Sequence, residues 1–121
     1  MMVVMRNTIK NHIDFATDRS CPYATTDLFI IRTRPAKFEN DARYGLVVTK
    51  RNFRFAVERN RAKRLLRDWI RFAEQYMCDN LDYVFFASAN ILNETVTREI
   101  GRDTMVRALQ NIKNRNDSLK K

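Results

Sequence analysis

The chain has few of the residues from which catalytic and metal sites are usually built. Its 121 residues include two glycines, two cysteines and one histidine. Glycines as sparse as Gly45 and Gly101 exclude a glycine-rich loop around phosphates. His12 and the two cysteines lack the spacing of metal ligands. The serines have no histidine or carboxylate partner in the pattern, so we predict no catalytic residue and no metal site in the protein itself.

Long hydrophobic runs are missing as well. The apolar opening MMVVM is five residues long, which is shorter than the core of a signal peptide, and no stretch is long enough to span a membrane. Cys21 and Cys78 lie far apart in the sequence, and we interpret them as free thiols of a reducing compartment. These features predict a cytoplasmic protein that has no membrane partner.

Positive charge is what the sequence has in excess. Lysine and arginine number 23 against 14 acidic residues, which gives a formal charge of +9. Residues 50–71 carry nine basic and two acidic groups, a net +7, whereas the rest of the chain holds 14 basic and 12 acidic groups. Charge concentrated in this way indicates a binding site for a polyanion, with nucleic acid as the first candidate.

Hydrophobic periodicity predicts a single α+β domain over residues 1–121. The expected elements are a short helix that Asn7 or Thr8 caps, strands at 28–31, 43–50 and 82–88, and helices at about 56–77 and 94–113. Residues 43–50 are nearly apolar on both faces, which is typical of a central strand. We expect loose tails at 1–7 and 114–121.

The expected helix at 56–77 has two opposite faces at about 100° per residue. The apolar face consists of Ala62, Leu65, Leu66, Trp69 and Ala73. The opposite face is a basic row formed by Asn60, Lys63, Arg64, Arg67 and Arg71, flanked by Arg59 and Arg61. Since almost no acids are interspersed, the cations of this row repel one another, and a bound polyanion would remove that repulsion. The row predicts a polyanion-binding helix without distinguishing RNA from DNA.

Three residues near this helix allow two interpretations each. Asn60 either reads a base edge or bonds a phosphate or backbone group. Phe53 either stacks on an unpaired base or closes the hydrophobic core. For Phe55 the core interpretation is favoured.

Residues 43–71, RYGLVVTKRNFRFAVERNRAKRLLRDWIR, resemble the signature of the bacterial ribonuclease P protein component. That signature has a Gly-Leu-x-Val-Ser/Thr-Lys-Lys/Arg strand end, a short loop, an Ala-Val/His-x-Arg-Asn-Arg-x-Lys-Arg helix start and then Leu-x-Arg. The positions that fit it in order are Gly45, Leu46, Val48, Thr49, Lys50, Arg51, Ala56, Arg59, Asn60, Arg61, Lys63, Arg64, Leu65 and Arg67. Looser similarity extends the resemblance to about residues 9–113.

This resemblance implies a fold and an activity. The fold is an α-β sandwich of ribosomal-protein-like type, in the order α-β-β-β-α-β-α, with a left-handed β-α-β crossover. The implied partners are the catalytic RNA of ribonuclease P and a precursor tRNA with its 5′ leader, and DNA is not among them. The RNA would hold the Mg²⁺ ions and perform the cleavage, with none bound by the protein alone.

The resemblance also assigns roles to residues. Contacts with the catalytic RNA are implied for Arg59, Asn60, Arg61, Lys63, Arg64 and Arg67, and the basic row extends this set to Arg71. A cleft for the single-stranded leader is implied at Phe15, Thr49, Lys50, Arg51 and Asn52, with Phe53 as a further candidate. Family members often carry a second cleft phenylalanine four residues after the first, where this chain has Arg19. This departure predicts weaker or more electrostatic contact with the leader.

Two other functions use the same basic helix. A ribosomal-type protein that buttresses RNA would share the helix but has no need for a substrate cleft. A DNA-binding regulator would place Asn60 and its arginines in a major groove, but the sequence lacks a paired helix-turn-helix. We therefore keep the ribosomal-type protein as the main alternative to a ribonuclease P subunit.

Overall fold

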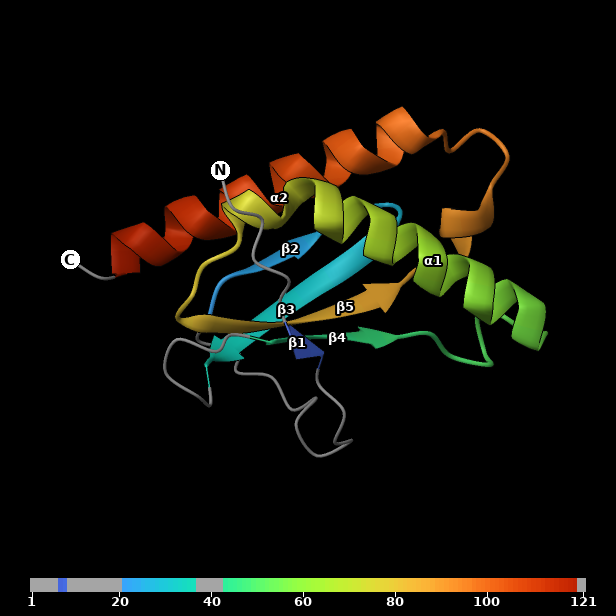
Figure 1. The fold of residues 1–121 in the computed structure, drawn as a ribbon, viewed down its shortest axis with the longest axis horizontal. Helices are drawn as coiled ribbons and strands as arrows, with labels where there is room; N and C mark the ends of the chain where they lie inside the picture. The colour runs from blue at the N-terminus through green and yellow to red at the C-terminus, as the bar shows by residue number, and fades with distance from the viewer. Residues whose placement is uncertain (1–6, 9–20, 37–42, 120–121) are drawn as a thin grey trace.

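The computed structural model describes residues 7–8, 21–36 and 43–119 (Figure 1). Its elements are the strands β1 (Asn7–Thr8), β2 (Tyr23–Thr25), β3 (Phe29–Pro35), β4 (Arg43–Val47) and β5 (Leu81–Ala87), the helices α1 (Ala56–Ala73) and α2 (Arg98–Leu119), and the short 3-10 helices η2 (Glu74–Tyr76) and η3 (Ala89–Leu92). The strands form one sheet in the order β1-β4-β5-β3-β2. The mixed α+β class is therefore confirmed.

The neighbouring inner strands β4 and β5 run parallel to each other, with Gly45 opposite Val84. β4 also pairs in parallel with β1, and β5 pairs antiparallel with β3. The predicted central position of this strand is thus confirmed, since β4 has a neighbour on each side, but the strand ends at Val47 rather than at residue 50. β5 is buried along its length apart from Phe86, which is half-buried.

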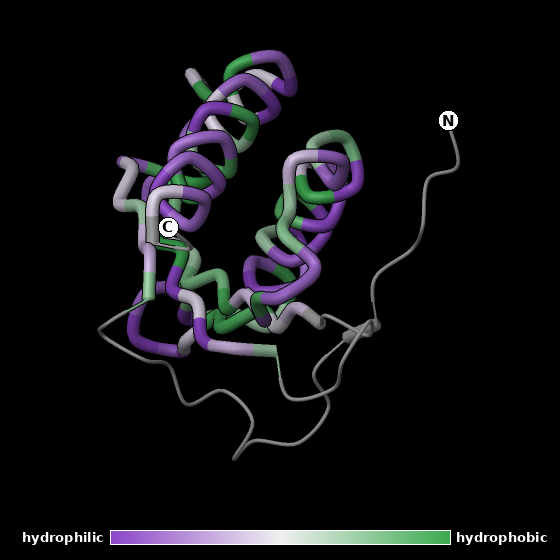
Figure 2. Tube along the Cα trace, turned by 90° about the vertical axis from the view of Figure 1, so that its left-hand side faces the viewer, coloured by the Kyte–Doolittle hydropathy of each residue, from purple (hydrophilic) through white to green (hydrophobic). Residues whose placement is uncertain are grey.

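The connection from β4 through α1 to β5 joins two parallel neighbours. Viewed from the helix side with both strands pointing up, β5 lies to the left of β4, so the crossover is left-handed (Figures 1 and 2). Nearly all such connections are right-handed, and the unusual hand agrees with the resemblance. A single loop, residues 48–55, connects the end of β4 to the start of α1.

Both long helices cover the same face of the sheet (Figure 2). The core forms where they meet it and contains fully buried side chains from α1, α2 and the strands: Leu66, Trp69, Met105, Leu109, Ile112, Phe29, Ile31 and Phe85. Trp69 lies against Phe29, with ring centroids 6.2 Å apart. Because burial of such side chains is the main favourable term in folding, this layer fixes how α1 is held.

Several boundaries differ from the sequence predictions. β2 occupies residues 23–25, where the hydrophobic pattern predicted no strand, because they pair with residues 30–32 of β3. Asn7 and Thr8 pair with β4, and the rest of the helix expected there lies outside the described residues. The strand expected at 28–31 continues to Pro35, since it pairs with β5 over its whole length.

The last helix is displaced toward the C-terminus. It begins at Arg98 rather than near 94, because the Thr97 hydroxyl accepts a hydrogen bond from the Ile100 N–H at 3.2 Å and caps it. It runs to Leu119, so residues 114–119 are helical where a loose tail was predicted. The helix continues there because Asn116 is buried and its side-chain amide donates a hydrogen bond to the Asn80 side-chain oxygen at 3.0 Å.

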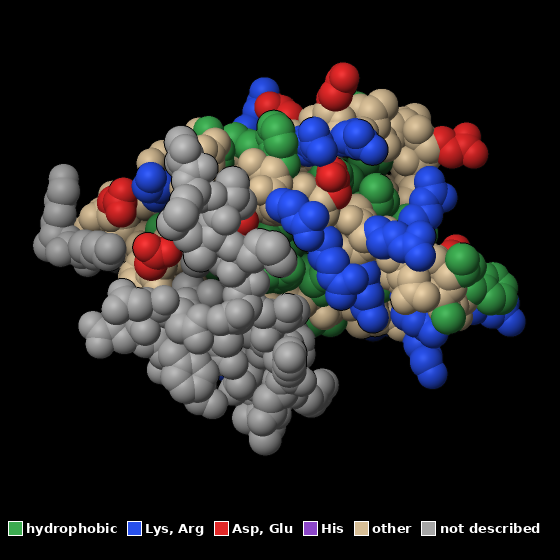
Figure 3. Space-filling view, viewed as in Figure 1, with side chains coloured by type: hydrophobic (Ala, Val, Ile, Leu, Met, Phe, Trp, Pro, Cys, Tyr) green, Lys and Arg blue, Asp and Glu red, His purple; other side chains and the backbone are tan. Residues whose placement is uncertain are grey.

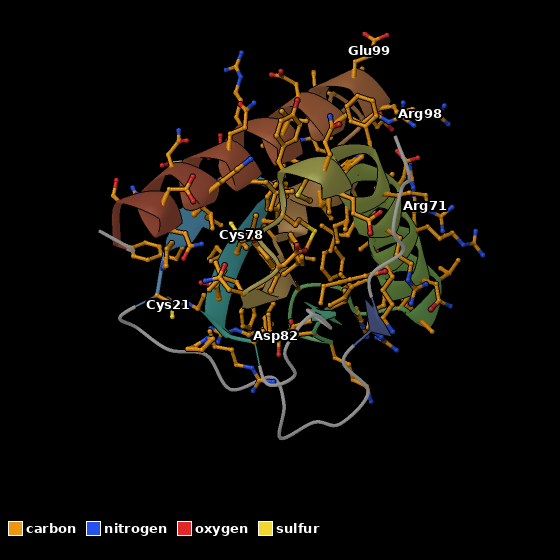
Figure 4. The ribbon with its side chains drawn as sticks, turned by 60° about the vertical axis from the view of Figure 1, so that its left-hand side comes forward. Cys21, Arg71, Cys78, Asp82, Arg98 and Glu99 are labelled. Atoms are coloured by element: carbon orange, nitrogen blue, oxygen red, sulfur yellow. The ribbon has the colours of Figure 1, made fainter. Side chains whose placement is uncertain are left out.

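Cys21 and Cys78 form no disulfide with each other, as predicted. Cys78 lies in the interior and Cys21 near the edge of the sheet, well apart (Figure 4). Within the described ranges, no helix has the length and apolar character needed to cross a membrane.

Candidate nucleic-acid interface

The outward face of α1 carries the basic row. Asn60, Arg61, Arg64, Arg67 and Arg71 are exposed, and Lys63 is half-buried. None of these six side chains forms an ion pair or hydrogen bond with another of the described residues. Figure 3 shows lysine and arginine side chains as a band across α1. The face therefore presents uncompensated cations to solvent, as the sequence predicted.

The opposite face of α1 holds this row in place. Ala62, Leu66, Trp69 and Ala73 are buried to within 1% exposure, and Leu65 packs partly against the same core. A helix anchored along its whole length by apolar contacts presents its other side at fixed spacing. The prediction that α1 has one buried apolar face and one largely exposed basic face is confirmed.

Asp68 is the one acid in the middle of α1, and its partner lies on α2. The Arg102 guanidinium donates two hydrogen bonds to the two carboxylate oxygens, at 3.1 and 3.2 Å. The Arg102 guanidinium carbon also lies 4.7 Å from the centre of the Phe72 ring. Arg102 lowers the pKa of Asp68 by its hydrogen bonds and then by its charge, against a desolvation effect of burial that raises it. The Asp68 carboxylate is thus bonded to Arg102 of α2 and forms no hydrogen bond with a cation of the basic row.

Arg98 adds a cation to this region from another element. It lies at the start of α2, and its charge contributes with that of Arg71 to lowering the pKa of Asp68. In Figure 4, Arg71 and Arg98 come from the two helices and point outward on the same side of the molecule. Sequence reasoning missed Arg98, because only the packing of α2 on α1 brings residues 71 and 98 together.

Replacing Asp68 with asparagine tests this bridge through its pH dependence. The lowered pKa means that the ionised pair stabilises the fold above the ordinary value of 3.8, and that this stability is lost as the pH falls through the folded-state pKa. The carboxylate is 40% exposed, so solvent screening limits the loss at pH 7 to about 1 kcal/mol at most. Urea unfolding of both proteins at pH 7 and pH 3 should show the difference shrinking at the lower pH. A difference that stayed constant would contradict an electrostatic role.

Arg59 has a structural task that the sequence did not indicate. Its guanidinium donates to the backbone carbonyl oxygens of Phe53 at 2.9 Å and Arg54 at 3.2 Å. Arg59 therefore ties the loop before α1 to the first turn of the helix. It remains half-buried at the border of the basic row, so its first effect is to position the loop.

The loop after β4 carries the predicted cleft residues Thr49, Lys50, Arg51 and Asn52. The Phe53 N–H donates to the Thr49 carbonyl oxygen at 3.0 Å, and the Asn52 N–H donates to the Thr49 hydroxyl at 3.3 Å. The Asn52 side-chain amide donates to the Ala87 carbonyl oxygen at the end of β5. These bonds form a fixed turn in which Lys50 and Arg51 are exposed. Phe15, the remaining cleft residue, lies outside the described residues.

The structure answers the question left open for Phe53 and contradicts the interpretation favoured for Phe55. Phe53 is 2% exposed and belongs to the core, so it has no free face for a base and does not serve as a stacking residue of the cleft. Phe55, expected in the core, is 59% exposed. Both rings lie in a non-periodic loop, where no sequence repeat indicates which one faces inward.

A separate hollow of about 490 Å³ lies between β2 and α2. Its rim includes Tyr23, and the centre of the Tyr23 ring lies 5.9 Å from the guanidinium carbon of Arg32 and 5.7 Å from that of Arg115. None of the predicted site residues lines it. β2 is the opposite edge strand of the sheet from β1, so this hollow is distinct from the basic face.

Comparisons with known proteins agree with this architecture. Over 94 residues, the chain is 33% identical to the ribonuclease P protein component of Pasteurella multocida, covering 75% of this chain and 76% of that protein. It is 32% identical over 80 residues to the same component of Pseudoalteromonas translucida, which covers 64% of this chain but only 56% of that relative.

Solved structures show the same fold. The RNase P protein of Staphylococcus aureus superposes with a TM-score of 0.69 at 20% identity, over 88% of this chain and 94% of that one. The protein from Thermotoga maritima gives 0.62 at 21% identity, over 74% and 81% of the two chains. The family model for ribonuclease P matches residues 6–113. Since that match spans most of the sequence, the chain belongs to the ribonuclease P protein family.

Proposed function

We propose that this protein is the non-catalytic subunit of a ribonucleoprotein endonuclease that removes the 5′ leader from precursor tRNA. The observation that carries the proposal is the basic face of α1, where exposed arginines have no acidic partner among the described residues. Catalytic ribonuclease P RNA is the proposed ligand of this face. Family membership favours this RNA over the ribosomal-type alternative.

Arginine suits such a surface because its planar guanidinium pairs with two phosphate oxygens at once. Each phosphate that a cation neutralises releases condensed counterions, so affinity falls with rising salt. Arg64, Arg67 and Arg71 are the main contacts in this proposal, with Asn60 and Arg61 on the first turns. Arg59 would act on RNA mainly by fixing the loop that precedes them.

The leader is proposed to run beside the loop after β4. Lys50 and Arg51 are exposed there on a turn held by hydrogen bonds, which provides preorganised cations for a single strand. Phe15 is proposed to complete the cleft. With Arg19 in place of a second phenylalanine, leader contact in this protein would depend more on charge.

The cleavage itself is assigned to the partner RNA with its Mg²⁺ ions. Water attacks the phosphorus, the bond to the leader 3′ oxygen breaks, and the mature tRNA keeps the 5′ phosphate. The positive charges on the basic face of α1 would repel a metal ion. The carboxylate of Asp68, the acid in the middle of this helix, is already bonded to Arg102. The protein would therefore contribute binding and positioning rather than metal ligands.

Cleavage of a precursor tRNA at low Mg²⁺ tests the proposal. A bacterial ribonuclease P RNA should cut poorly alone and well with this protein, because the added cations replace part of the screening that Mg²⁺ provides. Protein without RNA should not cut. The rate of 5′ leader release by gel electrophoresis is the measurement.

The affinity of the reconstituted complex for precursor and for leaderless tRNA provides the control. A preference for the precursor that appears only with the protein would support the leader cleft. Failure of the protein to stimulate cleavage by RNAs from several bacteria would refute the subunit role. Binding without stimulation would favour the ribosomal-type alternative.

A further inference from the structure

One aromatic ring is exposed at the start of the basic helix. Phe55 is 59% exposed, and Val57, two residues further on, is 75% exposed. Both lie within the stretch 50–71 that carries nine basic residues. At the end of the molecule where α1 begins, Figure 3 shows hydrophobic side chains among lysine and arginine side chains. A large ring exposed at such a place has no packing role in the protein core.

The backbone beneath Phe55 is held firmly. Its N–H donates to the Glu58 carboxylate at 3.1 Å, and its carbonyl oxygen accepts from the N–H groups of Glu58 and Arg59 at 3.1 and 3.2 Å. The bonds from Arg59 to the Phe53 and Arg54 carbonyl oxygens fix the preceding residues. The ring therefore projects from a preorganised turn, which lowers the entropic cost of using it for binding.

Arg54 lies over this ring without being tied to an acid. Its guanidinium carbon is 5.6 Å from the ring centre, and its side chain forms no ion pair with the described residues. Phe72, at the other end of α1, offers a contrast. It is similarly exposed at 52%, but the arginine over it, Arg102, is bonded to Asp68. Only the arginine at Phe55 is free to turn toward a phosphate.

We propose that Phe55 and Arg54 form a stacking site for one unpaired RNA base, with Arg54 on the adjoining phosphate. The inference rests on the proposed function, since it assumes that RNA occupies the basic face. Aromatic rings bind unpaired bases of any sequence because every base has a π-face, and nearby cations hold the backbone. The base comes either from the catalytic RNA or from the leader, and both present the same chemistry.

The experiment compares the variants Phe55→Ala, Phe55→Trp and Phe72→Ala. Two probes are used: a bacterial ribonuclease P RNA alone, and a leader-bearing precursor tRNA added to the reconstituted complex. Phe55→Ala should weaken binding of one probe by about 5- to 100-fold, and the affected probe identifies the source of the base. Phe55→Trp should retain affinity, and its fluorescence should be quenched on binding. The native Trp69 is 1% exposed and supplies a constant background.

Phe72→Ala is the matched control, because it removes a similarly exposed phenylalanine at the other end of α1. Its affinity for both probes should stay within about twofold of the unmodified protein. If Phe55→Ala binds both probes as tightly as the unmodified protein, the stacking site is refuted while the proposed function stands. Equal losses from Phe55→Ala and Phe72→Ala would also refute it. If the unmodified protein binds neither probe, both proposals fail together.

Discussion

Replacing Arg64 and Arg67 together with alanine is expected to weaken binding of ribonuclease P RNA by about 100-fold. Both side chains are exposed on the anchored helix α1 and lack an acidic partner within the described part of the chain. A charge-assisted hydrogen bond contributes about 1.5–3 kcal/mol, or roughly tenfold or more in affinity for each residue. Filter binding at several salt concentrations measures both the affinity and its salt dependence.

The salt dependence distinguishes phosphate contact from loss of structure. Removing two contacts should flatten the slope of log affinity against log salt by roughly 1.5. Arg107→Ala is the control for loss of an exposed arginine outside the basic face, because it removes one positive charge from α2, where Arg107 is 79% exposed and pairs with Asp103 at 3.1 Å. An unchanged slope in the double variant, or an equal change in Arg107→Ala, would contradict the role assigned to the basic face.

Gly101→Ala is expected to lower the free energy of unfolding by about 3 kcal/mol. A Cβ atom at this position would lie 2.0 Å from Cε2 and 2.2 Å from Cζ2 of the Trp69 indole. The indole is 1% exposed in the core and has little room to move away. Helix propensity alone would predict the opposite sign, since alanine favours a helix interior by up to about 1 kcal/mol over glycine. Urea unfolding followed by circular dichroism measures the change.

A double-mutant cycle with Trp69→Phe isolates the clash. Phenylalanine lacks the second ring of the indole, including Cζ2, which lies 2.2 Å from the added Cβ, so Gly101→Ala should cost less in that background. Gln110→Ala, at an exposed position of the same helix, should change the free energy of unfolding by less than about 0.5 kcal/mol. The same cost in both backgrounds would show that the close approach of α1 and α2 is not the cause.

Much of the site was predictable from the sequence because α1 is periodic. The spacing of Leu66, Trp69 and Ala73 indicated one buried face, and the spacing of Arg64, Arg67 and Arg71 indicated an exposed basic face. Both are observed. The central position of β4 was also predictable, since its two faces are nearly apolar. The family resemblance added the order of the elements and the hand of the crossover.

Residues without periodic neighbours were predicted poorly. Phe53 and Phe55 lie two positions apart in a loop, and only the packed core determines that the first is buried and the second exposed. The end of the last helix was missed because the partner of the buried Asn116 is Asn80, far away in the sequence. β2 was missed because a three-residue strand depends on pairing with β3 rather than on its own composition.

The sequence by itself determined the concentration of charge and the amphipathic pattern of α1, since helical periodicity depends only on local spacing. Tertiary structure alone decided which charges remain available. It paired Asp68 with Arg102 of α2, brought Arg98 to the same side as Arg71, and turned Arg59 back onto the loop carbonyl oxygens. The physical reason is that ion pairs and hydrogen bonds depend on distances between atoms, and between distant segments these distances exist only after the chain has packed.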